Sequence, residues 1–568
     1  MPTIDIDYPE FEKLLGMKLN RNMEKVNEVL ELVKGEAKLF DEKADVMSIE
    51  IKDTNRPDIW NVEGLSRALR CFLGLETSPK EYKVGKPLLE VFVDERLGNI
   101  RPYIGCSVIR GAKLTDAIIR GFMHMQDKLD QSYGRNRQRT SIGLYDYDLI
   151  KSPLSYSVAK PTAISFVPLG VEEKMSLKEI LQKHPKGLEY GHIVNKHPIY
   201  PILLDAEKKV LSFPPIINSN DLGRITDQTK NVLVEVTGTM HETVLTVVKI
   251  VTLSLIDRGG KAYSAIVHYP REKQTVLTPN FEVKSMDLDV AYANKVLGLD
   301  LTPRQIVKLL PKAGFSVEKA SDNKVTVKIP CYRVDVMHQV DLIEDVAVAY
   351  GYDNIEPLWR RKPTTGSMRS EQGLLDIARE LMVGLGFQEI LTYTLTNPEN
   401  LFARMNCKKE RVVELANPKV QTLTCLRNWL LPSLMEFLSY NTSVEYPQKI
   451  FELGKVTLLD ANQETRTRDE DWLAAVVCHA NANFSEIKST LDSVFLNLGI
   501  EWQIKEAKHS SFIDGRVGSI NVNREKVGIV GEVHPKVLEI WKLENPAAAF
   551  EINMEKILKI HAFVSGAH

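Results

Sequence analysis

Four carboxylates lie close together within Ile329 to Pro357, a stretch that reads IPCYRVDVMHQVDLIEDVAVAYGYDNIEP. They are Asp335, Asp341, Glu344 and Asp345. The last three follow the spacing i, i+3 and i+4, which puts them on one face of a helix. Like charges at that spacing repel by roughly 0.2–0.5 kcal/mol per pair, so the pattern raises the question of a compensating cation.

Two interpretations fit this acidic motif. In the first, the acids lie at a solvated helix start and gain roughly 0.3–1 kcal/mol from the helix dipole. In the second, they supply oxygen ligands to a hard cation, and carboxylates without His or Cys suit Mg²⁺ better than Zn²⁺. The spacing alone leaves both interpretations open.

The neighbouring residues predict the elements that carry the motif. Residues 324–329 (KVTVKI) alternate between apolar and polar side chains, which indicates a half-buried strand. From Val340 onward apolar residues recur at helical spacing, so we expect a helix that stops at Gly351.

A polar turn is a second candidate site. Pro214-Pro215 fixes an extended backbone, and Asn218 and Ser219 then present polar groups at a turn. Composition alone favours an ordinary turn. No Ser-His-Asp or Cys-His set that could supply a nucleophile is evident in the surrounding sequence, residues 88–272.

The composition is that of a folded, soluble, multi-domain protein. The 568 residues are 43% hydrophobic, and 73 basic against 75 acidic residues give a net charge of -2, which argues against a general nucleic-acid coat. The six cysteines form no C-x-x-C pair, so they predict neither a zinc site nor a disulfide framework and fit a reducing compartment. The N-terminus lacks the apolar core of a signal peptide, and the run Val244 to Ile256 is too short for a membrane span. We expect a cytoplasmic protein.

The pattern of elements predicts an α+β, multi-domain fold with four regions. Their expected ranges are 1–85, 88–272, 276–351 and, after the basic linker at 359–363, 364–568. In the third region, helices followed by a hairpin give a winged-like order typical of some DNA binders, with Thr302 as an N-cap and Pro303 at the first helical position. Residues 287–350, however, hold 8 basic and 9 acidic residues, which favours a structural role over phosphate contacts.

Several phrases resemble one known family. They are Ile-Pro-x-x-Arg-x-Asp, Asp-Leu-Ile-Glu-Asp and Ala-Tyr-Gly-Tyr-Asp-Asn-Ile in the acidic motif, and NRPDIWNVEGLSRALRCFLGLE at residues 55–76. The family is the β subunit of phenylalanyl-tRNA synthetase, in its archaeal and eukaryotic cytosolic type, and the resemblance covers nearly the whole chain. It implies a ligase subunit that works with an α subunit as an (αβ)₂ heterotetramer on tRNA(Phe), with ATP used by the holoenzyme. For Arg56, Pro57 and Asp58 we expect scaffolding.

The resemblance also assigns the acidic motif. It implies that the four acids hold a magnesium ion near the contact with the α subunit, as a structural site. This chain has Asp345 where bacterial relatives carry Glu, a shorter side chain that leaves room for water.

Region 88–272 resembles the family's editing domain, which hydrolyses tyrosine wrongly attached to tRNA(Phe). The resemblance rests on GRNRQRTSIGLYDYDL and PPIINSNDLGRIT. It places Asn218 in the editing pocket, with the hydroxyl of Ser219, where relatives commonly have Gly, as a second candidate contact. The family often reads His-Asp-Leu-Asp where this chain has Tyr145 to Asp148, so we expect no catalytic histidine and a reaction that uses a positioned water and the substrate's ribose hydroxyl.

Three alternating arginines lie at the start of the sequence GRNRQRTSIGLYDYDL. Arg135, Arg137 and Arg139 fit either a solvated edge strand or a contact with the phosphates at the 3′ end of tRNA. The sequence leaves these two alternatives equally open.

The last region resembles a class II synthetase core that has lost its chemistry. Adenylate formation needs arginines that stabilise charge on phosphate. The strand in the place of the second class motif, EYPQKIFELGKV, offers only Lys449 and Lys455. We therefore expect no amino-acid activation by this chain and a domain kept for packing against the α subunit. The alternatives are a free-standing aminoacyl-tRNA deacylase and a non-catalytic scaffold with a dead editing site.

Overall fold

The computed structural model describes residues 2–41, 43–358 and 366–565. The predicted basic linker at 359–363 lies outside these ranges. The chain divides into two compact units, Met1–Trp359 and Arg360–His568. In the described residues no helix is long and apolar enough to cross a membrane.

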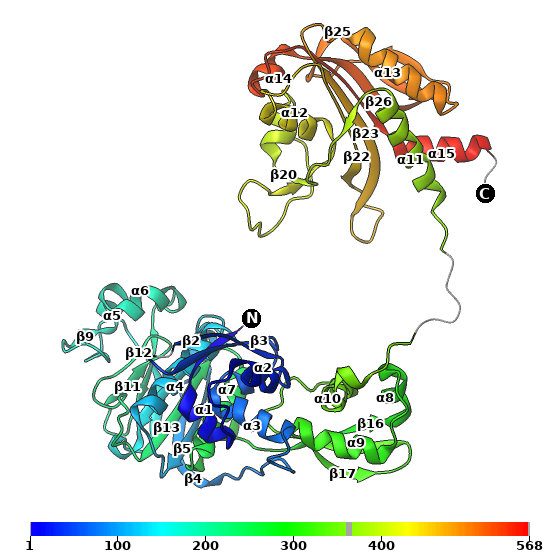
Figure 1. Cartoon of the computed structure of the whole chain (residues 1–568). Coiled ribbons are helices and arrows are strands. Elements are labelled where there is room, and N and C mark those ends of the chain that lie inside the picture. Colours follow the sequence, from blue (N-terminus) through cyan, green and yellow to red (C-terminus); the bar gives the residue numbers. More distant parts are fainter. Residues whose placement is uncertain (1, 42, 359–365, 566–568) are drawn as a thin grey trace. The chain divides into compact units, whose positions relative to one another are not determined.

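The first unit begins with a small three-stranded antiparallel sheet in the order β1-β3-β2 (Figure 1). Its elements are β1 (Thr3–Asp7), α1 (Tyr8–Leu15), α2 (Met23–Glu31), β2 (Gly35–Asp41), β3 (Val46–Ile51) and α3 (Val62–Phe72). Asp7, Asn22 and Asn61 cap the three helices with their side-chain oxygens. Pro57 opens a short 3₁₀ turn, and Arg56 and Asp58 form a buried two-bond ion pair at 2.9 Å, which confirms the expected scaffolding.

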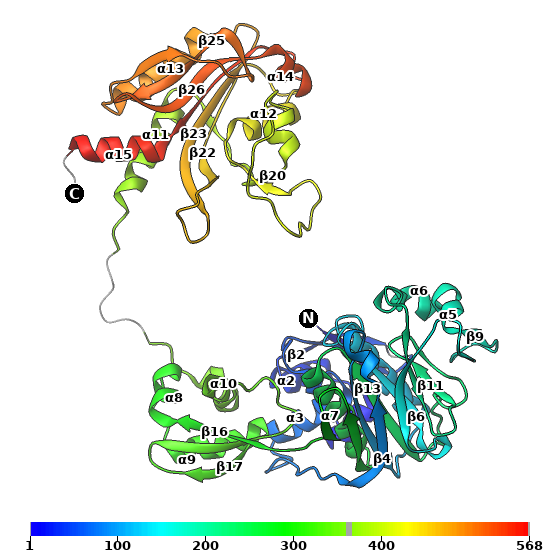
Figure 2. The ribbon, with the colours of Figure 1, turned by 180° about the vertical axis from the view of Figure 1, so that it is seen from behind.

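A ten-stranded mixed sheet forms the centre of this unit (Figure 2). Its path runs β12-β11-β10-β7-β4-β14-β5-β13-β6, with β15 paired to β14. The strands are β4 (Gly85–Val93), β5 (Tyr103–Arg110), β6 (Thr140–Asp146), β7 (Leu154–Ala159), β10 (Tyr200–Leu204), β11 (Val210–Phe213), β12 (Ile217–Asn218), β13 (Asn231–Gly238), β14 (Lys261–Tyr269) and β15 (Gln274–Thr278).

Two long helices, α4 (Asp116–Gln131) and α7 (His241–Asp257), pack in the same hydrophobic core as α1 to α3. The apolar run noted in the sequence is thus a buried helix, α7, apolar on nearly all sides because sheet and helices surround it. The short helices α5 (Leu177–Lys183) and α6 (Pro185–Tyr190) lie beside the β10–β12 end of the sheet.

The third region confirms most of its expected elements. Its antiparallel sheet has the order β16-β18-β17, with bounds β16 (Lys284–Asp289), β17 (Ser316–Ala320) and β18 (Lys324–Ile329). Its helices are α8 (Val290–Leu297), α9 (Pro303–Leu309) and α10 (Gln339–Tyr350). Thr302 caps α9 and Gly351, with φ 92°, ends α10, both as predicted.

The second unit is built on a seven-stranded sheet in the order β19-β22-β23-β27-β26-β25-β24. Its strands are β19 (Gln388–Glu389), β22 (Gln448–Leu459), β23 (Thr467–Cys478), β24 (Gln503–Glu506), β25 (Phe512–Val522), β26 (Glu525–Val533) and β27 (Ala547–Asn553). The helices are α11 (Ser370–Gly384), α12 (Leu431–Tyr440), α13 (Phe484–Asn497), α14 (Pro535–Ile540) and α15 (Met554–Ser565).

One segment in this unit departs from its local pattern. The sequence FQEILTYTLT, residues 387–396, is rich in β-branched and aromatic residues, which favours one continuous strand, yet it forms only β19 and the two-residue β20 (Leu395–Thr396). The buried carboxylate of Glu452 accepts hydrogen bonds from the backbone amide and the hydroxyl of Thr392, so the strand ladder ends there.

Candidate functional site

Asn218 and Ser219 are fixed by backbone bonds on both sides. Asn218 lies opposite Ser212 in the β11–β12 pair, and its carbonyl accepts a hydrogen bond from Leu169. The Ser219 hydroxyl accepts a hydrogen bond from the backbone amide of Leu222 and thereby stabilises the turn. Ser219 is almost fully buried. A Cβ on Gly223 would lie 2.5 Å from the Asn218 Cβ, so glycine is needed at that position.

Asn218 lines a cavity of about 200 Å³ between α4, β6 and the β11–β12 turn. Polar groups on its wall include Asp130, Ser212 and Glu235, which are each buried and each keep one side-chain oxygen without a hydrogen-bond partner among the described residues. Buried polar atoms without partners are costly, and their concentration in one cavity indicates a ligand site. No His or Cys occurs among the described residues that line it.

Glu235 is the acid in the wall of this cavity. It lies on β13, an interior strand next to the terminal strand β6, and burial raises the pKa of its carboxyl to about 7, although the hydrogen bond from Tyr145 and the charge of Arg101 oppose the shift. The Tyr145 hydroxyl donates to Glu235 Oε2 at 2.8 Å and lies 3.3 Å from Asn218 Oδ1. Glu235 Oε1 remains without a partner among the described residues.

A second buried acid, Asp130, lies at the end of α4. Burial raises the pKa of its carboxyl to about 7, against the charges of Arg137 and Arg101. Arg137 Nε lies 3.2 Å from Asp130 Oδ2, and its Nη1 donates to the carbonyls of Pro215 and Ile216 at 3.1 and 3.0 Å. Arg137 therefore ties α4 to the turn that carries Asn218.

The solvated edge strand, one of the two alternatives left open for the three arginines, does not form. Residues 132–138 form a turn in which Arg135, Asn136 and Arg137 all have positive φ, from 49° to 62°, and β6 starts only at Thr140. The turn directs Arg137 inward, whereas Arg135 is exposed and Arg139 half-buried, and both line a neighbouring surface cavity. Only these two keep the geometry expected of phosphate contacts.

The four acids of the acidic motif do not converge on one point. The Arg333 guanidinium binds Asp335 through two bonds, at 3.0 and 2.8 Å, and Asp345 at 2.5 Å. Asp341 instead accepts the backbone amides of residues 337 and 338, completing a capping box at the start of α10. Glu344 faces Lys34 of the N-terminal region at 2.5 Å.

This arrangement does not fit a magnesium ion held by all four acids together. In the described ranges no group of three or more His, Cys, Asp or Glu side chains is placed to hold a metal. The expectation of convergence is corrected because a buried arginine, a lysine and two backbone amides bind the acids separately. Magnesium binding at the motif stays a prediction.

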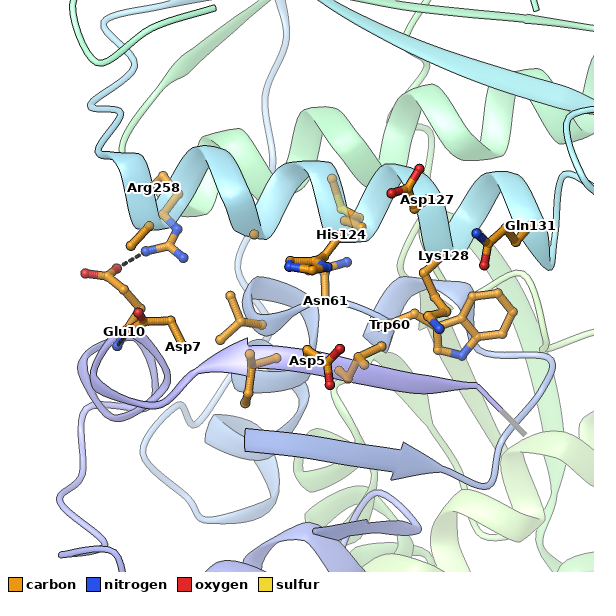
Figure 3. Close-up of a pocket in the computed structure, with 16 residues that line it drawn as sticks. Asp5, Asp7, Glu10, Trp60, Asn61, His124, Asp127, Lys128, Gln131 and Arg258 are labelled. Carbon is orange, nitrogen blue, oxygen red and sulfur yellow. Dashed lines mark hydrogen bonds and ion pairs between the residues drawn. The ribbon is translucent and has the colours of Figure 1, made fainter. Parts of the chain in front are cut away.

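Another cavity, of about 220 Å³, lies between β1 and α4 (Figure 3). Among its charged side chains, Arg258 pairs with Glu10 and, at 2.6 Å, with Glu63. His124 and Asp127 reach it from α4. We read it as a junction between the N-terminal region and the central sheet.

The two lysines of the candidate class motif are engaged internally. Lys449 lies 3.1 Å from Glu486, and Lys455 lies 3.0 Å from Asp471. A buried arginine, Arg427, contacts Glu452 at 2.8 Å on the same sheet. Each of these three cations thus has a carboxylate partner within the second unit.

Sequence reasoning missed the two buried acids and Tyr145 as site residues. The signal for Glu235 was present, because VLVEV places one acid inside an otherwise apolar strand. Asp130 carried no such signal, since it lies among the polar residues of an amphipathic helix.

Comparisons with known proteins agree over the whole chain. Family models described as phenylalanyl tRNA synthetase beta chain CLM domain and tRNA synthetase B5 domain match residues 356–554 and 286–352. Phenylalanine–tRNA ligase β subunits from Pyrococcus abyssi and Pyrococcus furiosus are both 42% identical, over 97% and 98% of this chain and 99% and 100% of their own lengths. The crystal structure of an N-terminal fragment of the Pyrococcus horikoshii phenylalanyl-tRNA synthetase β subunit, 38% identical, matches with a TM-score of 0.59 over 62% of this chain and all of the fragment. The chain therefore belongs to the phenylalanine–tRNA ligase β-subunit family.

Proposed function

We propose that this β subunit hydrolyses tyrosine from mischarged tRNA(Phe) in the cavity lined by Asn218 and Glu235. The observation that carries the proposal is the unpartnered Oε1 of Glu235, a buried acceptor in the wall of a cavity that a side chain can enter. A pocket that must bind a hydroxyl rejects the analogue without it far better than an apolar pocket rejects an added hydroxyl. Phenylalanine would leave Glu235 unsatisfied, and tyrosine would satisfy it.

The chemistry follows from what the cavity contains. Hydrolysis breaks the ester bond between the tyrosyl carbonyl carbon and the ribose oxygen, while water supplies the new hydroxyl on carbon and the proton on the leaving oxygen. Since the lining offers no His or Cys in the described residues, this chain contributes binding and orientation, and the attacking water is positioned with help from the substrate's own ribose hydroxyl.

Activation of phenylalanine belongs to the α subunit in this proposal. A β subunit of this ligase works with an α subunit and tRNA in a complex that depends on ATP and generally uses Mg²⁺. The second unit acts as a class II-like domain without catalytic arginines and packs against the α subunit in an (αβ)₂ assembly. The engaged Lys449 and Lys455 support this view. Purified alone, the chain should show no phenylalanine-dependent ATP–pyrophosphate exchange, and robust exchange would overturn this part.

Two further assignments complete the proposal. Arg135 and Arg139 are the candidate contacts for the 3′ end of tRNA, because they line a surface cavity and lie in or directly after the turn that contains Arg137, which reaches the editing cavity. To bind a magnesium ion at the acidic motif, Asp335 and Asp345 would have to release Arg333. Measuring whether Mg²⁺ changes the assembly of the subunits tests this magnesium site.

The test of editing is deacylation of Tyr-tRNA(Phe) by the αβ complex. Asn218→Ala and Glu235→Gln should each lower the deacylation rate by about tenfold or more, the value of one lost hydrogen bond to a charged or buried group. Phenylalanylation should be unchanged. Asn220→Ala, two residues away and outside the cavity lining, is the matched control and should keep full activity.

The outcomes separate the alternatives. A wild-type complex that does not deacylate Tyr-tRNA(Phe) would identify a scaffold with a dead editing site. Normal deacylation by both variants would remove this cavity from the reaction.

A further inference from the structure

Tyr145 lies behind the wall of the proposed editing cavity. It is fully buried on β6, directly next to β13, and its hydroxyl contacts two polar groups of the pocket. The shorter bond, 2.8 Å, goes to Glu235 Oε2, and the longer, 3.3 Å, to Asn218 Oδ1.

A glycine, Gly143, lies beside this contact and leaves room for it. Gly143 lies opposite Glu235 in the β6–β13 ladder. A Cβ at Gly143 would lie 2.3 Å from the Tyr145 hydroxyl and 2.6 Å from Glu235 Oε2, so any larger residue would displace the pair. A phenol and a carboxylate held together across a glycine form a built contact rather than incidental packing.

The other ionisable groups near Glu235 come from separate elements. Arg101 precedes β5 and supplies positive charge, while Cys106 on β5 and Tyr156 on β7 are buried groups whose pKa values are raised. Arg101 does not replace the Tyr145 bond, because its guanidinium donates to Thr237, to Ser141 and to the carbonyl of Arg137.

We propose that Tyr145 is a positioning residue for editing, which holds one oxygen of Glu235 so that the other oxygen receives the hydroxyl of the tyrosyl group. The inference rests on the proposed function of the cavity. A donor on Oε2 fixes the carboxylate plane and favours its charged form over the protonated one. An ionised Glu235 accepts the substrate hydroxyl, and Tyr145 thereby couples selectivity to pH.

The experiment compares Tyr145→Phe with wild type in the αβ complex, using Tyr-tRNA(Phe) across pH 6 to 9. Loss of the donor raises the pKa of Glu235, which is about 7 in the intact protein. For an upward shift of about one unit, the variant's kcat/KM relative to wild type should fall about fivefold at pH 7 and recover by pH 9. Tyr147→Phe is the matched control, because that hydroxyl donates to the carbonyl of Leu88 and not to the pocket.

Two further readouts exclude a purely structural effect. Phe-tRNA(Phe), which lacks the hydroxyl, should be deacylated equally by Tyr145→Phe and wild type. In the Glu235→Gln background, Tyr145→Phe should cause no pH-dependent loss, since the amide does not titrate.

A uniform loss at every pH, or a variant equal to wild type throughout, would overturn the role of Tyr145. Absence of deacylation by wild type would instead overturn the proposed function. If Tyr145→Phe fails to fold, Gly143→Ala, two residues from Tyr145 on β6, displaces the same pair and should give the same pH-dependent loss, and a pH-independent result would again refute the proposal.

Discussion

Replacing Arg333 with alanine tests whether the acidic motif is held by ion pairs within the chain. The Arg333 side chain is only 3% exposed, and its partners Asp335 and Asp345 are 9% and 14% exposed. It also donates to the carbonyl of Ala313 and lies over the ring of Phe315, 4.6 Å from its centre. Alanine removes the whole set at once and leaves two buried carboxylates with only the more distant Arg56, 3.7 Å from Asp335, as a cation nearby.

The cost follows from that burial. Removing one partner of a buried ion pair typically costs about 3–5 kcal/mol, because the remaining charge stays desolvated. In the intact protein the Arg333 guanidinium and Arg56 lower the pKa of Asp335, although burial alone would raise it, while burial raises the pKa of Asp345. Without Arg333 both values rise, so the variant's deficit should be largest near pH 8 and shrink as acid protonates the two groups.

Hydrogen exchange of the α10 amides is the appropriate assay, since it reports local opening in a chain with more than one unit. A loss of about 3–5 kcal/mol accelerates exchange roughly 10²- to 10⁴-fold. Glu344→Gln provides the matched control on the same helix. Its partner Lys34 is 35% exposed and it is 54% exposed itself, so the change should cost at most about 1 kcal/mol. Acceleration of less than tenfold in Arg333→Ala, or equal effects in both variants, would refute the reasoning.

Two other expectations concern the editing cavity and the second unit. Arg137→Ala removes the bonds to the carbonyls of Pro215 and Ile216, so it should slow Tyr-tRNA deacylation about tenfold with unchanged tRNA affinity. A double Arg135/Arg139→Ala variant should instead weaken tRNA binding and reduce its salt dependence, which binding titrations at several salt concentrations would measure. Glu551 is buried with a pKa raised to about 7 from 4.5, so the stability it contributes is complete below pH 4.5 and lost as pH rises through 7. Glu551→Gln should therefore gain stability relative to wild type, by up to ~3 kcal/mol, between pH 5 and pH 8 in urea unfolding, and Glu555→Gln should not.

The sequence was most informative where a local pattern determines the element. The strand predicted at 324–329 and the helix predicted after Val340 were both confirmed, because the spacing of apolar residues along the chain determines such elements. The direction of each carboxylate was not predictable. It depends on Lys34, which lies far away in the sequence, and on Arg333, whose guanidinium reaches two acids from opposite ends of the motif.

The candidate site divides in the same way. Asn218 was found through its motif, and the structure places it on the cavity wall. Glu235 and Asp130 reach that wall from β13 and α4, and only the sheet register and helix packing bring them there. The spacing of residues along the chain does not predict such contacts.

The left-handed turn at Arg135 to Arg137 has a consequence for how this surface can change over evolution. In a strand, alternate residues share one face, and all three arginines would be constrained together. Here three successive positive φ values separate an inward anchor from outward charges. Mutations at Arg135 or Arg139 can change the charge of the surface without disturbing the pocket, while a change at Arg137 is constrained by the turn that it holds. One short basic segment thus contains a variable exterior and a constrained interior, and natural variation should be unevenly distributed between them.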